Sequence, residues 1–228
     1  MYKRVILFFI LISNTAISYS FASNFPDGFV ELNTYIPTVK LEIRYYTTEN
    51  FVGERIDGYE SPKAILTLQA ADALKNVQKE LLKFKLGLKV FDAYRPQLAV
   101  DHFARWAKDL NNIKMKNYYY PEINKVVLFI NGYIADKSGH SRGSTVDVTI
   151  VSLHDENSVE LDMGTNWDFF SPKSWPSSSD VTVQQRANRM LLQNVMSKHG
   201  FKPLKEEWWH FTLKHEPYPN HYFNFPIE

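Results

Sequence analysis

Two hydrophobic periods alternate along this chain of 228 residues, and they restrict its fold more than any other feature. Apolar residues recur at every second position over 39–45 and 145–151, which predicts strands, and a short apolar run at 88–91 predicts another. Helical spacing occurs over 65–81, 97–110 and 183–196. Because no internal repeat or linker interrupts them, these elements are expected to form one compact α+β domain.

Local signals predict where two of these helices begin and end. Ser61 and Pro62 have the residue types of an N-cap and a first helical position, and the helix they open should end near Gly87. Asp180 is a plausible cap for the last helix, which Gly200 should close. The tail after residue 214 is rich in proline and aromatic residues, and it is expected to pack as a cover.

Composition excludes several classes of protein. Hydrophobic residues make up 44% and aromatic residues 15%, which suits a folded chain with a sizeable core and not a disordered one. The formal net charge is +1, so no overall basic field favours nucleic acid as a partner. The absence of cysteine rules out disulfides, thiolate metal sites and a cysteine nucleophile. No feature of the sequence sets an oligomeric state.

The first 22 residues resemble a secretory signal. Two cations, Lys3 and Arg4, precede an unbroken apolar run from Val5 to Ile12, and small residues at Ser20 and Ala22 suit a signal peptidase. A run of eight residues is short of the roughly 20 that span a bilayer, so a membrane anchor is disfavoured. We therefore expect residues 1–22 to be removed, and residues 23–228 to be exported to the periplasm or beyond it without stable membrane insertion.

Two clusters carry imidazole and carboxylate groups together. His140 lies among small residues, and Asp147 lies on the strand predicted just after it, so a turn at Gly143 can bring both to one metal ion. In the second cluster, Glu207 and His210 are three residues apart among bulky aromatic residues. Burying such groups costs free energy unless they are paired, hydrogen-bonded or bound to a metal. Both clusters are therefore candidate parts of a metal site.

Two histidines and one carboxylate match a catalytic zinc that keeps a fourth position for water. His140, Asp147 and His210 supply that set, and Glu207 remains free to take a proton from the water. Because residues i and i+3 face opposite sides of a strand, Glu207 must lie at a strand end or bulge to share a site with His210. Non-haem iron uses the same ligand types, and a structural reading would make Asp147 a turn cap and the second histidine a core residue.

The clusters also resemble a known family. Residues 138–147 resemble the Ser-x-His-x-x-Gly-x-x-x-Asp motif, and residues 207–210 the Glu-x-x-His motif, of the zinc D-alanyl-D-alanine dipeptidases of the VanX type. Further blocks occur in that family's order over nearly all of the mature chain: Asp57-Gly58-Tyr59, Asp92-Ala93-Tyr94-Arg95-Pro96, Lys137-Ser138, Met163-Gly164, Trp208-Trp209 and Glu216-Pro217-Tyr218-Pro219.

The resemblance implies a role for each residue of the site. It implies one zinc ion per chain, held by His140, Asp147 and His210. It implies that Glu207 is the general base and that Arg95 stabilises the tetrahedral oxyanion, a task that suits a guanidinium fork. It further implies a dipeptide pocket in which Asp168 holds the substrate's free ammonium group. The residues implied to line this pocket are Tyr45, Ser138 and Asp168.

The sequence departs from the resistance-type enzymes in two ways. Gly139 stands where a second serine is expected beside Ser138, which puts a substrate hydrogen bond and the tolerance for the second residue in doubt. The predicted export signal is the other departure, since enzymes of the resistance type act in the cytoplasm. An exported enzyme is expected to act on D-Ala-D-Ala that is released during cell-wall turnover.

The leading hypothesis is a single α+β domain, with a mainly antiparallel sheet flanked by helices and a zinc site like that of hedgehog and D,D-peptidase proteins. It would hydrolyse D-Ala-D-Ala to two D-alanines. One alternative is a D,D-carboxypeptidase or endopeptidase that acts on peptidoglycan peptides. The other is a zinc-stabilised protein that binds cell-wall fragments without cutting them.

Overall fold

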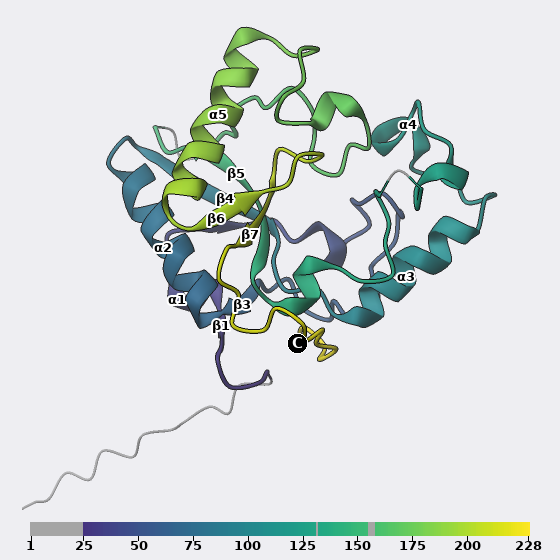
Figure 1. The fold of residues 1–228 in the computed structure, drawn as a ribbon, viewed down its shortest axis with the longest axis horizontal. Helices are drawn as coiled ribbons and strands as arrows, with labels where there is room; N and C mark the ends of the chain where they lie inside the picture. The colour runs from purple at the N-terminus through teal and green to yellow at the C-terminus, as the bar shows by residue number, and fades with distance from the viewer. Residues whose placement is uncertain (1–24, 131, 155–157) are drawn as a thin grey trace, which may run out of the picture.

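The computed structural model describes residues 25–130, 132–154 and 158–228, so the predicted signal segment lies outside the described residues. A five-stranded sheet in the order β2-β4-β5-β7-β6 forms the centre of the molecule (Figure 1). Its strands pair antiparallel except at the β2–β4 edge, which is parallel. The strands are β2 (Lys40–Leu41), β4 (Leu86–Asp92), β5 (Thr145–Ser152), β7 (His210–Leu213) and β6 (Phe201–Pro203).

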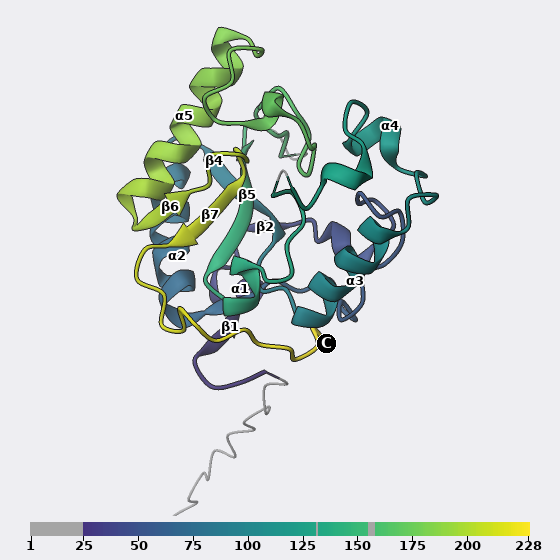
Figure 2. The same ribbon diagram turned by 45° about the vertical axis from the view of Figure 1, so that its right-hand side comes forward.

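Helices flank this sheet, and a small second sheet pairs β1 (Phe29–Glu31) antiparallel with β3 (Ile65–Thr67). Figures 1 and 2 show α2 and α5 together at one side of the main sheet and α3 and α4 at the other. None of the helices in the described ranges is long and apolar enough to cross a membrane. The expected α+β domain with a mainly antiparallel sheet is confirmed. The helices are α1 (Leu32–Tyr35), α2 (Leu68–Leu82), α3 (Gln97–Lys108), α4 (Lys116–Tyr119) and α5 (Val183–Lys198).

Strand β5 lies at the middle of the sheet, and both of its faces are buried. One face carries Val146, Val148 and Ile150 into the hydrophobic core. The polar residues that alternate with them, which include Asp147, are buried as well. The predicted strand over 145–151 is confirmed, but its polar face turns toward the interior, where a carboxylate requires partners.

The strand predicted over 39–45 is wrong beyond its first residues. β2 pairs with β4 through Lys40 and Leu41 alone, and a 3₁₀ turn follows over Arg44–Tyr46. Three of the four alternating apolar residues, Val39, Ile43 and Tyr45, are nonetheless buried, and Leu41 is partly buried. The alternation therefore predicted which side chains are buried but not the strand. The turn takes the chain out of the sheet, and Tyr45 reaches Asp168 in the cleft that is described below.

The helix predicted from Ser61 begins later. Residues 65–67 form β3, so the helix starts at Leu68 with Thr67 as its N-cap residue. The Thr67 side chain makes no capping bond, because its hydroxyl pairs with that of Ser144 at 2.7 Å. The helix ends at Leu82, and Gly87 belongs to β4. Residues 65–67 are therefore a strand paired with β1, although their apolar spacing also suits a helix.

The last helix begins at Val183, and the predicted cap at Asp180 is wrong. Thr182 is the N-cap, and it forms a capping box with Gln185, in which each side chain accepts a hydrogen bond from the other residue's backbone amide. Gly200, with φ of +93°, follows the C-cap residue as predicted, in the left-handed conformation that glycine favours. Gln185 also donates to Asp162, so the start of α5 is joined to the segment 162–175 that is described below.

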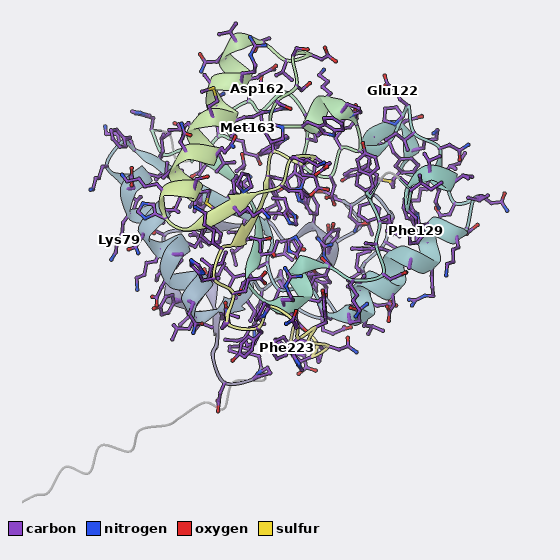
Figure 3. The ribbon with its side chains drawn as sticks, in the orientation of Figure 1. Lys79, Glu122, Phe129, Asp162, Met163 and Phe223 are labelled. Carbon is purple, nitrogen blue, oxygen red and sulfur yellow. The ribbon has the colours of Figure 1, made fainter. Side chains whose placement is uncertain are left out.

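The C-terminal tail packs as the predicted cover. The rings of Tyr218, Phe223 and Phe225 lie 4.9–6.0 Å from the ring of Phe29, and Figure 3 shows Phe223 at the end of the molecule where the tail lies. Ile227 then bridges to the segment beside Gly58 through backbone hydrogen bonds. The two ends of the described chain thereby close one edge of the fold.

Candidate active site

Three elements bring the predicted metal ligands together. His140 lies in a 3₁₀ turn over Gly139–Arg142, whose N-cap Ser138 accepts a hydrogen bond from the His140 amide at 3.2 Å. Gly143, with φ of +77°, ends this turn and leads the chain into β5. Asp147 on β5 and His210 on β7 are directly opposite each other in the antiparallel register. Strand pairing therefore unites residues that are 63 positions apart.

The three ligand atoms form a nearly equilateral triangle. His140 Nε2 lies 3.3 Å from His210 Nδ1 and 3.3 Å from Asp147 Oδ1, and His210 Nδ1 lies 3.2 Å from the same oxygen. Bonds of about 2.0–2.1 Å to a tetrahedral zinc would place the ligand atoms about 3.3–3.4 Å apart. The triangle therefore has the size of one face of such a site and leaves the fourth corner open.

Neighbouring groups hold these ligands so that one acceptor on each faces the triangle. The carbonyl of Ala93 lies 2.7 Å from His140 Nδ1, which sets that nitrogen as a donor and frees Nε2. The indole of Trp167 donates to Asp147 Oδ2 at 3.1 Å. The other oxygen, Oδ1, is buried and makes no acceptable hydrogen bond among the described residues. A cation between the three atoms satisfies this carboxylate, so the site fits a metal.

Electrostatics favour the metal-binding form at two of the three ligands. The exception is His210, where burial acts to lower the pKa but the hydrogen bond and charge of Asp147 outweigh burial and raise it. Burial lowers the pKa of His140, which keeps that imidazole neutral. Burial also acts to raise the pKa of Asp147, but the neighbouring imidazoles outweigh it and hold the pKa of this carboxyl far below its ordinary value. The opposite holds for Glu207, because burial raises its pKa to about 7, with the charge of Asp147 adding to the effect and His210 opposing it.

Glu207 has the position that sequence spacing required. It lies three residues before His210, where β7 begins, so the face alternation of a strand does not separate the two side chains. Its Oε2 lies 3.4 Å from His210 Nδ1, beside the open side of the triangle. A carboxylate that ionises near neutral pH at this position can accept and return a proton.

Arg95 is held rigidly at the rim of the same site. Its Nε and Nη2 donate to Asp92 Oδ2 at 2.9 and 2.8 Å, and Asp92 also accepts from the Tyr59 hydroxyl at 2.6 Å. The guanidinium lies over the rings of Tyr45 and Phe103 at 5.0 and 5.2 Å, and its Nη2 is 3.9 Å from the metal-facing carboxylate. Arg95 lines the cleft, so the donors that Asp92 does not occupy are available to a ligand there.

The cleft ends at a buried carboxyl group. Asp168 accepts a hydrogen bond from the Tyr45 hydroxyl at 2.7 Å and adopts a left-handed backbone with φ of +57°. Burial, with the charge of Asp147, raises the pKa of Asp168 well above its ordinary value. A cation placed against it would restore its charge. The cleft has a volume of about 240 Å³ and is lined by all eight site residues expected from the sequence: Tyr45, Arg95, Ser138, His140, Asp147, Asp168, Glu207 and His210.

Two contributors to the site could not be found from the sequence. Trp167 orients a metal-facing carboxylate from a segment with no period, and its only signal was its place beside Asp168. Asp92 belonged to a block of the resemblance, but nothing in the sequence indicated that it anchors Arg95.

The glycine at position 139, where a second serine was expected, has a structural reason, because a Cβ there would lie 2.9 Å from Thr145 Oγ1. The hydroxyl pair of Thr145 and Thr212, 2.9 Å apart, occupies that space.

Three metal-facing donors, an adjoining carboxylate and a fixed guanidinium define the site of a metal-dependent hydrolase. The family model described as D-Ala-D-Ala dipeptidase, a family of M15 peptidases, matches residues 26–228, so the chain belongs to that family.

Individual relatives agree with this assignment. A D-alanyl-D-alanine dipeptidase of Enterococcus faecium is 36% identical, covering 88% of this chain and 98% of the relative. One of Streptomyces coelicolor is 38% identical, covering 87% and 98%. The solved structure of a VanY D,D-pentapeptidase variant with Zn(II) is a distant likeness, with a TM-score of 0.42 and 13% identity over 69% of this chain and 77% of that one.

Proposed function

We propose that this protein hydrolyses the dipeptide D-Ala-D-Ala to two D-alanines, with one zinc ion held by His140, Asp147 and His210. The observation that carries the proposal is the triangle of ligand atoms with Glu207 at its open side and Arg95 at its rim. Two nitrogen ligands and one oxygen ligand suit zinc, which supplies an acidified water and polarises the scissile carbonyl when it is bound.

Glu207 takes the proton of the attacking water and later returns it to the leaving amine. Its raised pKa suits both steps, because such a carboxyl can accept a proton and release it near neutral pH. Arg95 donates to the carbonyl oxygen as negative charge develops there. A donor fixed in this way can lower the barrier by about 3 kcal/mol, or roughly a hundredfold in rate.

The other end of the cleft selects a short substrate with a free amine. Asp168 and the Tyr45 hydroxyl form an acceptor pair for the substrate ammonium, and Ser138 also lines the cleft. A volume of about 240 Å³ lies below the 300–1,000 Å³ that is usual for pockets of larger ligands. The buried carboxyl and the small volume favour a dipeptide over a longer peptidoglycan peptide.

The place of action follows from the N-terminal segment. Residues 1–22 have the cation, apolar run and small residues of a secretory signal. Its removal leaves a mature domain of residues 23–228, which would meet D-Ala-D-Ala released from the cell wall outside the cytoplasm. Sequencing the N-terminus of the protein recovered from the periplasm or medium tests this assignment, and an intact Met1 would contradict it.

The activity is tested with the zinc-loaded mature protein and three substrates: D-Ala-D-Ala, L-Ala-L-Ala and a muropeptide that ends in D-Ala-D-Ala. Free alanine is measured, with Glu207→Ala as the control that removes the base. Cleavage of the D,D-dipeptide that depends on Glu207 supports the proposal. Preference for the muropeptide would indicate a carboxypeptidase, and zinc binding without cleavage would indicate a binding protein.

A further inference from the structure

The segment 162–175 forms an excursion between β5 and α5, and it supplies two groups to the site. Trp167 donates to the metal-facing Asp147, and Asp168 accepts from Tyr45 at the end of the cleft. The outer side of this excursion lines a second pocket of about 450 Å³, formed in part by Thr165, Trp167 and Lys173. The excursion is held by the burial of Met163, Trp167 and Phe170 in the core and by hydrogen bonds to its backbone.

Three of those hydrogen bonds come from one buried arginine of α5, and they are distributed over both ends of the segment. Arg189 Nε donates to the carbonyl of Met163 at 2.7 Å, five residues before Asp168. Its Nη1 donates to the carbonyls of Lys173 and Trp175 at 3.0 and 2.8 Å, on the other side of the excursion. One guanidinium therefore ties both ends of the segment to the helix. Figure 3 shows the beginning of the segment, at Asp162 and Met163, beside α5.

The setting of Arg189 is unusual for a charged side chain. It is 2% exposed, and among the described residues no carboxylate forms an ion pair with it. Its Nη2 is buried without a hydrogen-bond partner. Burial lowers the pKa of this guanidinium to about 10, so it remains charged at neutral pH. A buried charge without a counter-ion is costly, and its fork of donors is the feature that neither lysine nor an apolar residue reproduces.

Other side chains of α5 assist at the first end of the segment. Asn188 donates to the carbonyl of Asp162 at 2.8 Å, and Gln185 donates to the Asp162 carboxylate at 2.8 Å. Neither reaches the second end. Within α5, Arg189 alone donates to the carbonyls at 173 and 175 among the hydrogen bonds of the described residues.

We propose that Arg189 is a positioning residue that holds Asp168 where it can bind the substrate's ammonium group. The inference rests on the proposed dipeptidase function and adds to it the device that sets amine recognition. Asp168 contributes to recognition only when its carboxylate is placed to within a fraction of an ångström. Loss of the Arg189 hydrogen bonds, which act as a clamp on the segment, should therefore weaken the enzyme's preference for substrates with a free amine more than it weakens hydrolysis itself.

The test compares two substrates of the same shape, D-Ala-D-Ala and N-propanoyl-D-alanine, which lacks the amine. A hydrogen bond to a charged group predicts that wild type prefers the first by about 10- to 100-fold in kcat/KM. In Arg189→Met this preference should fall at least fivefold, through a higher KM for D-Ala-D-Ala, when both substrates are assayed at saturating zinc because Trp167 lies on the same segment. Arg189→Lys, which keeps the charge without the fork, should lie between the two.

Arg186→Met is the matched control, because Arg186 is on the same helix and donates to the carbonyl of Val181, outside the excursion. It should keep the wild-type preference. Equal losses on both substrates in folded Arg189 variants would overturn the proposal, and so would an unchanged preference. If the Met variant does not fold, the Lys variant decides the question by the same ratio.

Hydrogen exchange separates this inference from the proposed function. Amides of 162–175 should exchange faster in Arg189→Lys than in wild type, whether or not either substrate is cleaved. If wild-type protein cleaves neither substrate, the proposed function is wrong, and only hydrogen exchange then tests whether Arg189 holds the segment. Unchanged exchange of the amides of 162–175 would overturn the proposal for Arg189.

Discussion

Replacing Trp167 by phenylalanine tests how the metal-facing carboxylate is oriented. The indole donates to Asp147 Oδ2 at 3.1 Å, which leaves Oδ1 directed at the two histidines. Phenylalanine keeps an aromatic ring in contact with Tyr45 and Phe91 but removes the donor. Asp147 then loses the hydrogen bond that fixes its rotation, and Oδ2 keeps only the Arg95 guanidinium at 3.9 Å.

The expected effect on metal affinity follows from the strength of that bond. A hydrogen bond to a charged group contributes about 1.5–3 kcal/mol, and 1.36 kcal/mol corresponds to a factor of ten. Loss of an outer-shell partner of a metal ligand typically lowers metal affinity 10- to 100-fold, which agrees with this figure. We therefore expect Trp167→Phe to raise the zinc dissociation constant about 10- to 100-fold.

A competition titration against a coloured zinc chelator measures this constant. Trp208→Phe is the matched control, because this equally buried indole donates at 2.9 Å to the neutral hydroxyl of Thr165 and to no metal ligand. Both variants lose the same volume, so both should lose similar stability in denaturant. Equal zinc affinities in the two variants would refute the argument that the bond to Asp147 orients the ligand.

Three further predictions follow. Glu207→Gln should lower kcat for D-Ala-D-Ala by about 100- to 10,000-fold while zinc content, measured by mass spectrometry, stays at wild-type level; near-normal turnover would exclude it as the base. Lys198 and His199 hold the pKa of Glu80 below its ordinary value, so this group stabilises the fold above the unfolded pKa of 4.5 and ceases to do so as the pH falls through the lower folded pKa. Glu80→Gln should therefore lower the urea midpoint at pH 7, with the difference from wild type shrinking toward pH 3. Gly139→Ser should cost about 1–3 kcal/mol by overpacking against Thr145, and adding Thr145→Ala should recover part of this loss in urea unfolding; additive losses would contradict the contact.

Much of the fold could be predicted because local period and burial agree. The strand over 145–151 and the helix over 97–110 were found because their apolar residues face the core at the spacing that their own geometry requires. The prediction was wrong at 39–45 and at 65–67, where tertiary contacts decided the backbone. Tyr45 leaves the sheet to reach Asp168, and Ile65 pairs with β1 although its spacing also suits a helix.

The sequence by itself determined the chemical inventory of this protein. A cysteine-free chain with two His-carboxylate clusters and an arginine before Pro96 limits both the reaction and the ligands, since side-chain chemistry and nearby spacing are local properties. Family motifs added the expected role of each residue, because such motifs are also defined by local residue order.

Only the tertiary structure decided how those groups are held. The register of β5 against β7 places Asp147 opposite His210, Ala93 and Trp167 set which atoms of His140 and Asp147 face one another, and Arg189 ties the segment that bears Asp168. These contacts join residues 20–63 positions apart through strand pairing, backbone carbonyls and single donors. Such partners leave no periodic trace in the sequence, because any residue has a carbonyl and distance in space is set by the packing of the whole chain.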